Sequence, residues 1–126
     1  MIGLLLVTHD TLGEALLQCV RHVLNRQPPQ IALLGVGAQD DPLVLLPRAQ
    51  QLLDSVDSGQ GVLVLTDIYG ATPSNLCARL LQPGHVEGIA GLSLPMLLRA
   101  LTYREQDLAT LVQRAVSGGC DGVVRM

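Results

Sequence analysis

Short apolar runs alternate along this chain with longer segments whose apolar residues recur at helical spacing. The apolar character of the runs is nearly continuous, which is typical of strands that are covered on both faces of a sheet. The fourth run is less hydrophobic, because Gly88 and Gly91 interrupt it. The four predicted strands are residues 2–7, 31–36, 61–66 and 86–92.

The segments between these runs carry signals for helix starts. The sequence TLGE at residues 11–14 matches a capping box, in which the Thr11 hydroxyl and the Glu14 carboxylate accept from free N–H groups. Asp-Pro at 41–42 and Thr-Pro at 72–73 each place a capping residue before a proline that a helix tolerates in its first turn. The predicted helices begin at these positions, and further elements are predicted at residues 94–101 and 105–117 (helices) and 123–126 (a short fifth strand).

The regular alternation of strand and helix indicates an α/β protein. No linker, repeat or low-complexity segment divides the chain, so we expect one domain over residues 1–126. Because strands that alternate with helices pair in parallel, the sequence predicts an open, doubly wound, mostly parallel sheet with helices on both faces. The order of the strands in the sheet does not follow from the pattern.

Composition narrows the class of protein further. The chain has no Trp, Phe or Lys and only two Tyr, so the core must be aliphatic. Its arginines are scattered, the net charge is −3, and nucleic-acid binding is therefore not expected. No apolar run reaches the roughly 18 residues of a membrane span, and the N-terminus does not resemble a signal peptide.

The cysteines indicate a reducing compartment. Three cysteines lie far apart with no CxxC pair, and Cys19 and Cys77 fall among apolar residues of predicted helices. We therefore expect these two thiols to be buried as small hydrophobic groups and the protein to be cytoplasmic.

Polar residues gather where three predicted strands end. In open α/β sheets, ligands bind outside the carboxyl ends of the strands, near the place where the strand order reverses. His9 follows the first strand and Asp67 follows the third, so both side chains project into one crevice if these strands are neighbours. The polar segments are residues 8–11, 66–75 and 92–96.

His9 is the candidate reactive group. An imidazole can be a nucleophile, a metal ligand or a general base. His22 and His85 have no partner at ligand spacing, so we expect them to be structural or solvated and expect no zinc site. A carboxylate from Asp67 on one ring nitrogen would fix the tautomer and leave the other nitrogen free. The alternative for Asp67 is that it caps a turn.

The segment after Asp67 has the features of an anion site. Gly70 permits a tight turn, and Thr72 is a good helix N-cap. The free N–H groups at this helix start and the Thr72 hydroxyl could hold a phosphate. There is no P-loop and no lysine, so we expect no bound nucleotide cofactor and expect the phosphoryl group to come from another protein.

Three blocks of this chain resemble the enzyme IIA domain of the mannose-type bacterial phosphoenolpyruvate:sugar phosphotransferase system. The resemblance covers essentially the whole chain, and its most specific parts occur in the order expected of the family. They are VTHDTLGEALL (7–17), GVLVLTDIYGATPSN (61–75) and IAGLSLPMLLRAL (89–101).

This resemblance implies a phosphotransferase that works through a phosphohistidine. His9 would accept phosphate from phospho-HPr and pass it to a IIB protein, with Asp67 orienting the ring. The N–H groups of Ala71 and Thr72 would bind the phosphate. The family also implies four parallel strands with an antiparallel C-terminal edge strand, and a homodimer that exchanges C-terminal strands. Contact with a membrane would be indirect, through a transporter complex.

The chain departs from the family pattern at several site positions. Asp10 stands where glycine often follows the histidine, and we expect its carboxylate to point away from the phosphate, capping the first helix. Ala71 and Thr72 replace the more usual glycine and serine, and threonine keeps the hydroxyl. Ser93 stands where asparagine is common.

Two other functions are compatible with parts of the pattern. The first is a regulatory module whose phosphorylation on His9 controls a partner without sugar transport, because it uses the same chemistry. The second is a nucleotide- or flavin-binding domain, which the absence of GxGxxG after the first strand disfavours.

Overall fold

Four parallel strands form the centre of the molecule, in a computed structural model that describes residues 1–126. The strands are β1 (Gly3–His9), β2 (Ile31–Val36), β3 (Val62–Thr66) and β4 (Val86–Ala90). Their order in the sheet is β2-β1-β3-β4, and every neighbouring pair is parallel. The predicted open parallel sheet is therefore confirmed, and β1 and β3 are neighbours.

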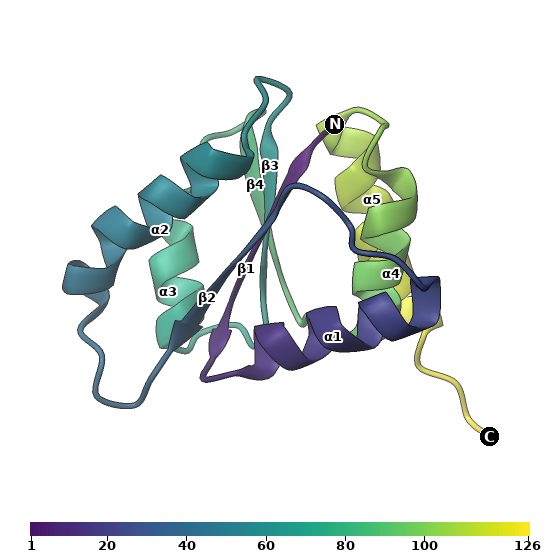
Figure 1. Cartoon of the computed structure of the whole chain (residues 1–126), viewed down its shortest axis with the longest axis horizontal. Coiled ribbons are helices and arrows are strands. Elements are labelled where there is room, and N and C mark those ends of the chain that lie inside the picture. Colours follow the sequence, from purple (N-terminus) through teal and green to yellow (C-terminus); the bar gives the residue numbers. More distant parts are fainter.

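Five helices cover the two faces of this sheet (Figure 1). One face carries α2 (Pro42–Val56) and α3 (Thr72–Ala78). The other face carries α1 (Leu12–Leu24), α4 (Leu94–Tyr103) and α5 (Leu108–Asp121). The predicted doubly wound arrangement of helices is confirmed.

The two-sided burial of β1 explains its unbroken apolar sequence. Leu4 and Leu6 pack into the cluster beneath α1, α4 and α5, whereas Leu5 and Val7 pack beneath α2 and α3. All four side chains are fully buried. Because successive strand residues point to opposite faces, a strand between two helical layers must be apolar at every position.

The last helix extends further than its glycines predict. The expected range was 105–117, but α5 continues through Gly118 and Gly119 to Asp121. A Cβ on Gly118 would lie 2.5 Å from the Cβ of Arg99 on α4, a distance at which atoms overlap. Glycine is therefore needed here for the close approach of two helices, and it does not end the helix.

The predicted fifth strand is absent from this chain. Residues 123–126 belong to no element, and Val123 and Val124 are 86% and 72% exposed. These residues lead away from the body of the molecule after α5 (Figure 1). A strand needs a neighbouring strand for its backbone hydrogen bonds, and the tail makes no backbone bond to any strand.

The cysteines do not all behave as the pattern predicts. Cys77 on α3 is buried as expected, and desolvation raises its pKa to about 12. Cys19 on α1 is exposed, so its prediction as a buried residue is wrong. The helical spacing placed Cys19 near the apolar face of α1, but the side chain lies beyond the edge of that face.

No helix of the structure has the length and apolar character that crossing a membrane requires.

Candidate functional site

The carboxyl ends of β1 and β3 bring the predicted site residues together. β1 pairs with β2 on one side and with β3 on the other, so the direction of the chain connections reverses between β1 and β3. His9 is the last residue of β1, and Asp67 directly follows β3. The site therefore lies where the carboxyl ends of the strands meet, which is at the bottom of Figure 1.

One carboxylate oxygen of Asp67 holds His9 at two points. Asp67 Oδ2 lies 2.8 Å from His9 Nδ1 and accepts the His9 backbone N–H at 2.9 Å. The other oxygen, Oδ1, accepts the backbone N–H of Ile68 at 3.0 Å. This arrangement fixes the His9 ring relative to its own backbone, because both bonds end on the same oxygen atom.

The protonation of this pair follows from its surroundings. Burial by itself raises the pKa of Asp67, but the hydrogen bonds from the His9 backbone and ring, together with the charge of His9, lower it below the ordinary value. Asp67 is thus ionised at neutral pH and can only accept, so Nδ1 carries the ring proton. In the neutral form of the ring, Nε2 is then the nitrogen with the lone pair. It has no hydrogen-bond partner and belongs to a side chain that is 48% exposed.

The loop after Asp67 differs in detail from its prediction. Ala71 is the N-cap of α3, so the prediction of Thr72 at that position is wrong by one residue, and Thr72 is the first helical residue. Gly70 has φ of +89°, a left-handed conformation that favours glycine, and its N–H donates to Ser74 Oγ at 3.2 Å. The backbone N–H groups of Ala71 and Thr72 make no hydrogen bond in the protein.

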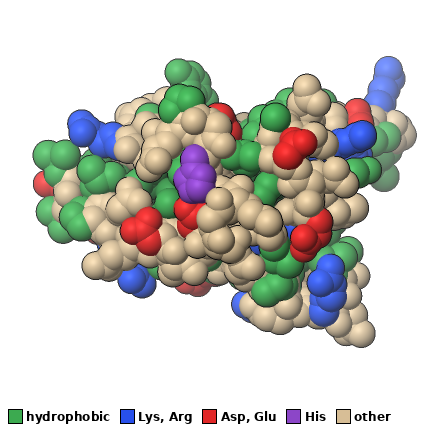
Figure 2. Space-filling model, turned by 90° about the horizontal axis from the view of Figure 1, so that it is seen from above, with side chains coloured by type: hydrophobic (Ala, Val, Ile, Leu, Met, Phe, Trp, Pro, Cys, Tyr) green, Lys and Arg blue, Asp and Glu red, His purple; other side chains and the backbone are tan.

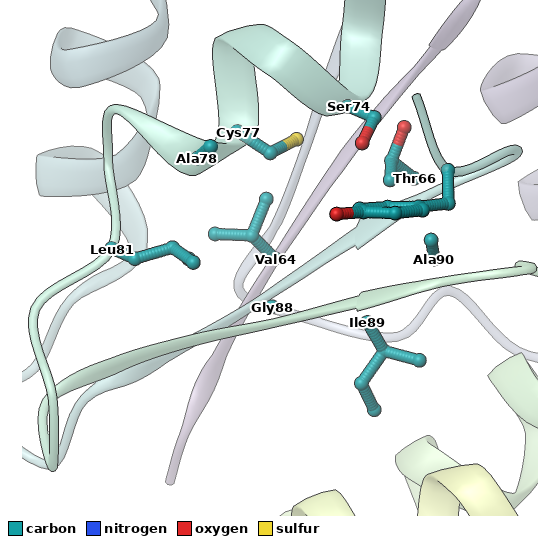
Figure 3. Close-up of a pocket in the computed structure, with 10 residues that line it drawn as sticks. Val64, Thr66, Ser74, Cys77, Ala78, Leu81, Gly88, Ile89 and Ala90 are labelled. Carbon is teal, nitrogen blue, oxygen red and sulfur yellow. The ribbon is translucent and has the colours of Figure 1, made fainter. Parts of the chain in front are cut away.

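A small recess lies beneath this loop, between α3 and the edge strand β4 (Figure 3). The side chains of Thr66 on β3 and Ser74 on α3 point toward one another here, and the Cys77 thiol lies beside them (Figure 3). The recess has a volume of about 120 Å³. Pockets for small organic ligands typically measure about 300–1,000 Å³, so this recess does not fit a nucleotide or a flavin.

The loop that follows His9 is held by a residue that the sequence pattern did not single out. Thr8 accepts the Gly13 N–H on its hydroxyl at 2.9 Å, whereas Thr11 makes no side-chain cap bond. The predicted capping box is therefore wrong. Asp10 has φ of +45°, and its carboxylate lies toward Gly37 and makes no hydrogen bond, so it does not cap α1.

The other histidines lie away from this site. His22 is exposed on α1 and makes no hydrogen bond. His85 has a structural contact, one of the two expected alternatives, because its Nε2 lies 2.6 Å from Asp57 Oδ2. No group of three or more His, Cys, Asp or Glu side chains could hold a metal ion.

Comparisons with known protein sequences find similarity over most of this chain. A family model described as "PTS system fructose IIA component" matches residues 3–116. The chain is 30% identical over 125 residues to a mannose-specific EIIAB component of Escherichia coli. This alignment covers 97% of this chain and 38% of the relative. It is 29% identical over 109 residues to a fructose-specific EIIA component of Bacillus subtilis. That alignment covers 83% of this chain and 72% of the relative.

Solved structures with the same fold are also similar to this chain. An EIIA component from Streptococcus agalactiae superposes with a TM-score of 0.86 at 23% identity, covering 99% of this chain and 97% of the other. A mannose/sorbose-specific IIA subunit from Enterococcus faecalis gives a TM-score of 0.87 at 22% identity, covering 99% and 94%. At these identities, the structural likeness supports the fold alone.

Proposed function

Because this chain belongs to the IIA family of phosphotransferase systems, we propose that it carries a phosphoryl group on Nε2 of His9. The observation that carries this proposal is the 2.8 Å contact between His9 Nδ1 and Asp67, which occupies one ring nitrogen and leaves the other exposed. An accessible nucleophilic nitrogen with an orienting carboxylate is what histidine phosphorylation needs.

The transfer step exchanges one P–N bond for another. The Nε2 lone pair attacks the phosphorus of a phosphohistidine on the donor, for which we propose phospho-HPr. The bond between phosphorus and the donor ring breaks, and the donor imidazole leaves with the electron pair. The His9 ring becomes positively charged, and the Asp67 carboxylate on Nδ1–H stabilises that charge. The same exchange in the opposite sense passes the phosphoryl group to a IIB protein.

Backbone groups after Asp67 are the proposed phosphate ligands. The N–H groups of Ala71 and Thr72 have no partner within the protein, and Thr72 adds an exposed hydroxyl. Gly70 contributes through its left-handed conformation, because its own N–H is bonded to Ser74. Donors that are already in place stabilise the charge of a phosphoryl oxygen without a reorganisation of the loop.

Labelling by the donor system tests this proposal. The chain is incubated with phosphoenolpyruvate, enzyme I and HPr, and its mass is then measured. We expect one added phosphate that is labile in acid and stable in base, and no added phosphate in His9→Ala. The matched control is His85→Ala, which also loses a histidine bonded to an aspartate. Labelling that persists in His9→Ala, or that is lost only in His85→Ala, would contradict the proposal.

We also propose that two copies of the chain exchange their C-terminal residues. The exposed tail carries Val123 and Val124, and β4 has a free edge because it pairs only with β3. An apolar groove lined by Ile89, Val116 and other residues lies along that edge. A tail added to β4 would satisfy backbone groups that are otherwise open to solvent. Sedimentation should give a dimer for the full chain and a monomer after removal of residues 123–126.

A further inference from the structure

The hydroxyl of Thr8 connects the reactive histidine to the first turn of α1. Thr8 is 1% exposed and lies one residue before His9 in β1. Its Oγ1 accepts the Gly13 N–H at 2.9 Å and donates to the His9 carbonyl at 3.3 Å. One buried side chain therefore bonds to groups on both sides of the loop that separates β1 from α1.

Thr8 has the role of a helix N-cap residue, because its hydroxyl accepts a free N–H group at the start of α1. Gly13 is the second residue of α1, so its N–H has no acceptor within the helix. Gly13 is also buried, and a buried donor without a partner costs about 1–3 kcal/mol. The N-cap residue, Thr11, makes no side-chain bond to this N–H, and Thr8 supplies the acceptor from the preceding strand.

The same hydroxyl completes the hydrogen bonding of the His9 backbone. Asp67 accepts the N–H of His9, and Thr8 donates to its carbonyl. The next residue, Asp10, has a positive φ and donates its N–H to the Val36 carbonyl at 3.0 Å. The N–H and the carbonyl of His9 and the N–H of Asp10 are thus all bonded, and the His9 ring is held at Nδ1 by Asp67.

We propose that Thr8 is a positioning residue for the phosphorylation of His9. Its hydroxyl fixes the His9 backbone, and this fixed backbone allows Nδ1 to meet Asp67 while Nε2 faces the donor. Thr8 is buried and cannot touch a partner protein. Its effect must therefore act through His9, on the rate of transfer and not on the binding of the donor. This inference rests on the proposed function of His9.

Three variants test the role of the hydroxyl. Thr8→Val keeps the shape and removes the hydroxyl, Thr8→Ser keeps the hydroxyl, and Thr11→Val is the control at a position without a cap bond. We expect Thr8→Val to lower kcat for transfer from phospho-HPr by about 10- to 100-fold, because small misplacements of reacting groups have effects of this size. KM for phospho-HPr should stay unchanged, and Thr8→Ser and Thr11→Val should keep the wild-type rate.

A spectroscopic readout separates positioning from a loss of stability. The ¹⁵N shifts of the His9 ring report which nitrogen carries the proton. In the wild type we expect the Nδ1–H form alone, and in folded Thr8→Val a mixture of the two neutral forms. A Thr8→Val protein with the wild-type rate and the wild-type ring shifts would overturn the proposal.

The proposal stays testable if Thr8→Val does not fold. Thr8→Cys carries a weaker hydrogen-bonding group, so its rate should fall between those of the valine and serine variants. A wild-type rate of transfer for Thr8→Cys would contradict the proposed positioning role of the Thr8 hydroxyl. If the wild-type chain accepts no phosphate at all, the proposed function of His9 fails, and the ring shifts still decide whether Thr8 positions His9.

Discussion

The molecule contains two histidine–aspartate pairs at opposite ends of one sheet, and they differ in what surrounds them. His9 and Asp67 lie at the carboxyl ends of the strands, with Nδ1 bonded at 2.8 Å. His85 and Asp57 lie in the loops that precede β4 and β3, with Nε2 bonded at 2.6 Å. Figure 2 looks onto that second end, where histidine and acidic side chains adjoin. A bonded pair is therefore not enough to define a reactive site.

The partners of each carboxylate show the difference in role. Asp57 also accepts the N–H groups of Gly59 at 2.8 Å and Gly61 at 3.3 Å, so it organises the turn before β3. Asp67 bonds mainly to the backbone and ring of His9. Loop N–H groups without partners follow Asp67 at Ala71 and Thr72. We infer that Asp57 stabilises a loop and that Asp67 prepares a histidine for reaction.

Removing the charge from each aspartate should give the largest contrast. We expect Asp67→Asn to slow phosphoryl transfer to His9 by about 10- to 100-fold, the usual effect of losing a carboxylate that orients a functional histidine. Asp57→Asn should transfer at the wild-type rate, because it lies at the other end of the sheet. Rapid-quench measurements with phospho-HPr compare the two rates. Equal slowing in both variants would remove the distinction between the pairs.

Truncating the aspartates should affect stability in the opposite order. Asp57→Ala leaves the N–H groups of Gly59 and Gly61 and the His85 ring without their acceptor. We expect a loss of about 1–3 kcal/mol in the free energy of unfolding, because Gly61 is buried and its donor would be unsatisfied. Urea unfolding of Asp57→Ala and Asp67→Ala provides the comparison. A larger loss in Asp67→Ala would show that the first pair is the structural one.

The pH dependence of stability should give the smallest difference. The pKa of Asp57 is lowered mainly by the hydrogen bond from His85, and the pKa of Asp67 is also lowered. A carboxyl group with a lowered pKa in the folded state contributes stability above its unfolded value of about 3.8, and this contribution is lost as the pH falls below it. Unfolding from pH 6 to pH 2 should therefore show less acid sensitivity in Asp57→Asn than in the wild type. An unchanged profile would contradict the assigned bond.

The layered fold and the meeting of His9 with Asp67 could be predicted from sequence, because both depend on simple rules. Continuous apolar runs indicate strands that are covered on both faces, and residues after parallel strands share one edge of the sheet. The local hydrogen bonds could not be predicted in the same way. Thr8 caps α1 from inside a strand, and nothing in the short TLGE motif shows that its own threonine and glutamate are not used.

Contacts between loops that are distant in sequence could not be predicted from the sequence pattern either. His85 and Asp57 are 28 residues apart, and their bond depends on how two loops at the amino ends of the strands are positioned relative to each other. Gly118 looks like a helix stop in sequence, but its neighbour in space, Arg99, explains why it is glycine. These features depend on tertiary packing, which overrides local preference.

The most direct test of the account is to locate the phosphate on the imidazole ring. The chain is phosphorylated with phosphoenolpyruvate, enzyme I and HPr, and the ¹⁵N shifts of its histidine rings are measured. We predict a phosphate on Nε2 of His9, with Nδ1 still protonated and bonded to Asp67. A phosphate on Nδ1 of His9, or on His85, would contradict the claim that Asp67 leaves Nε2 of His9 as the reacting atom.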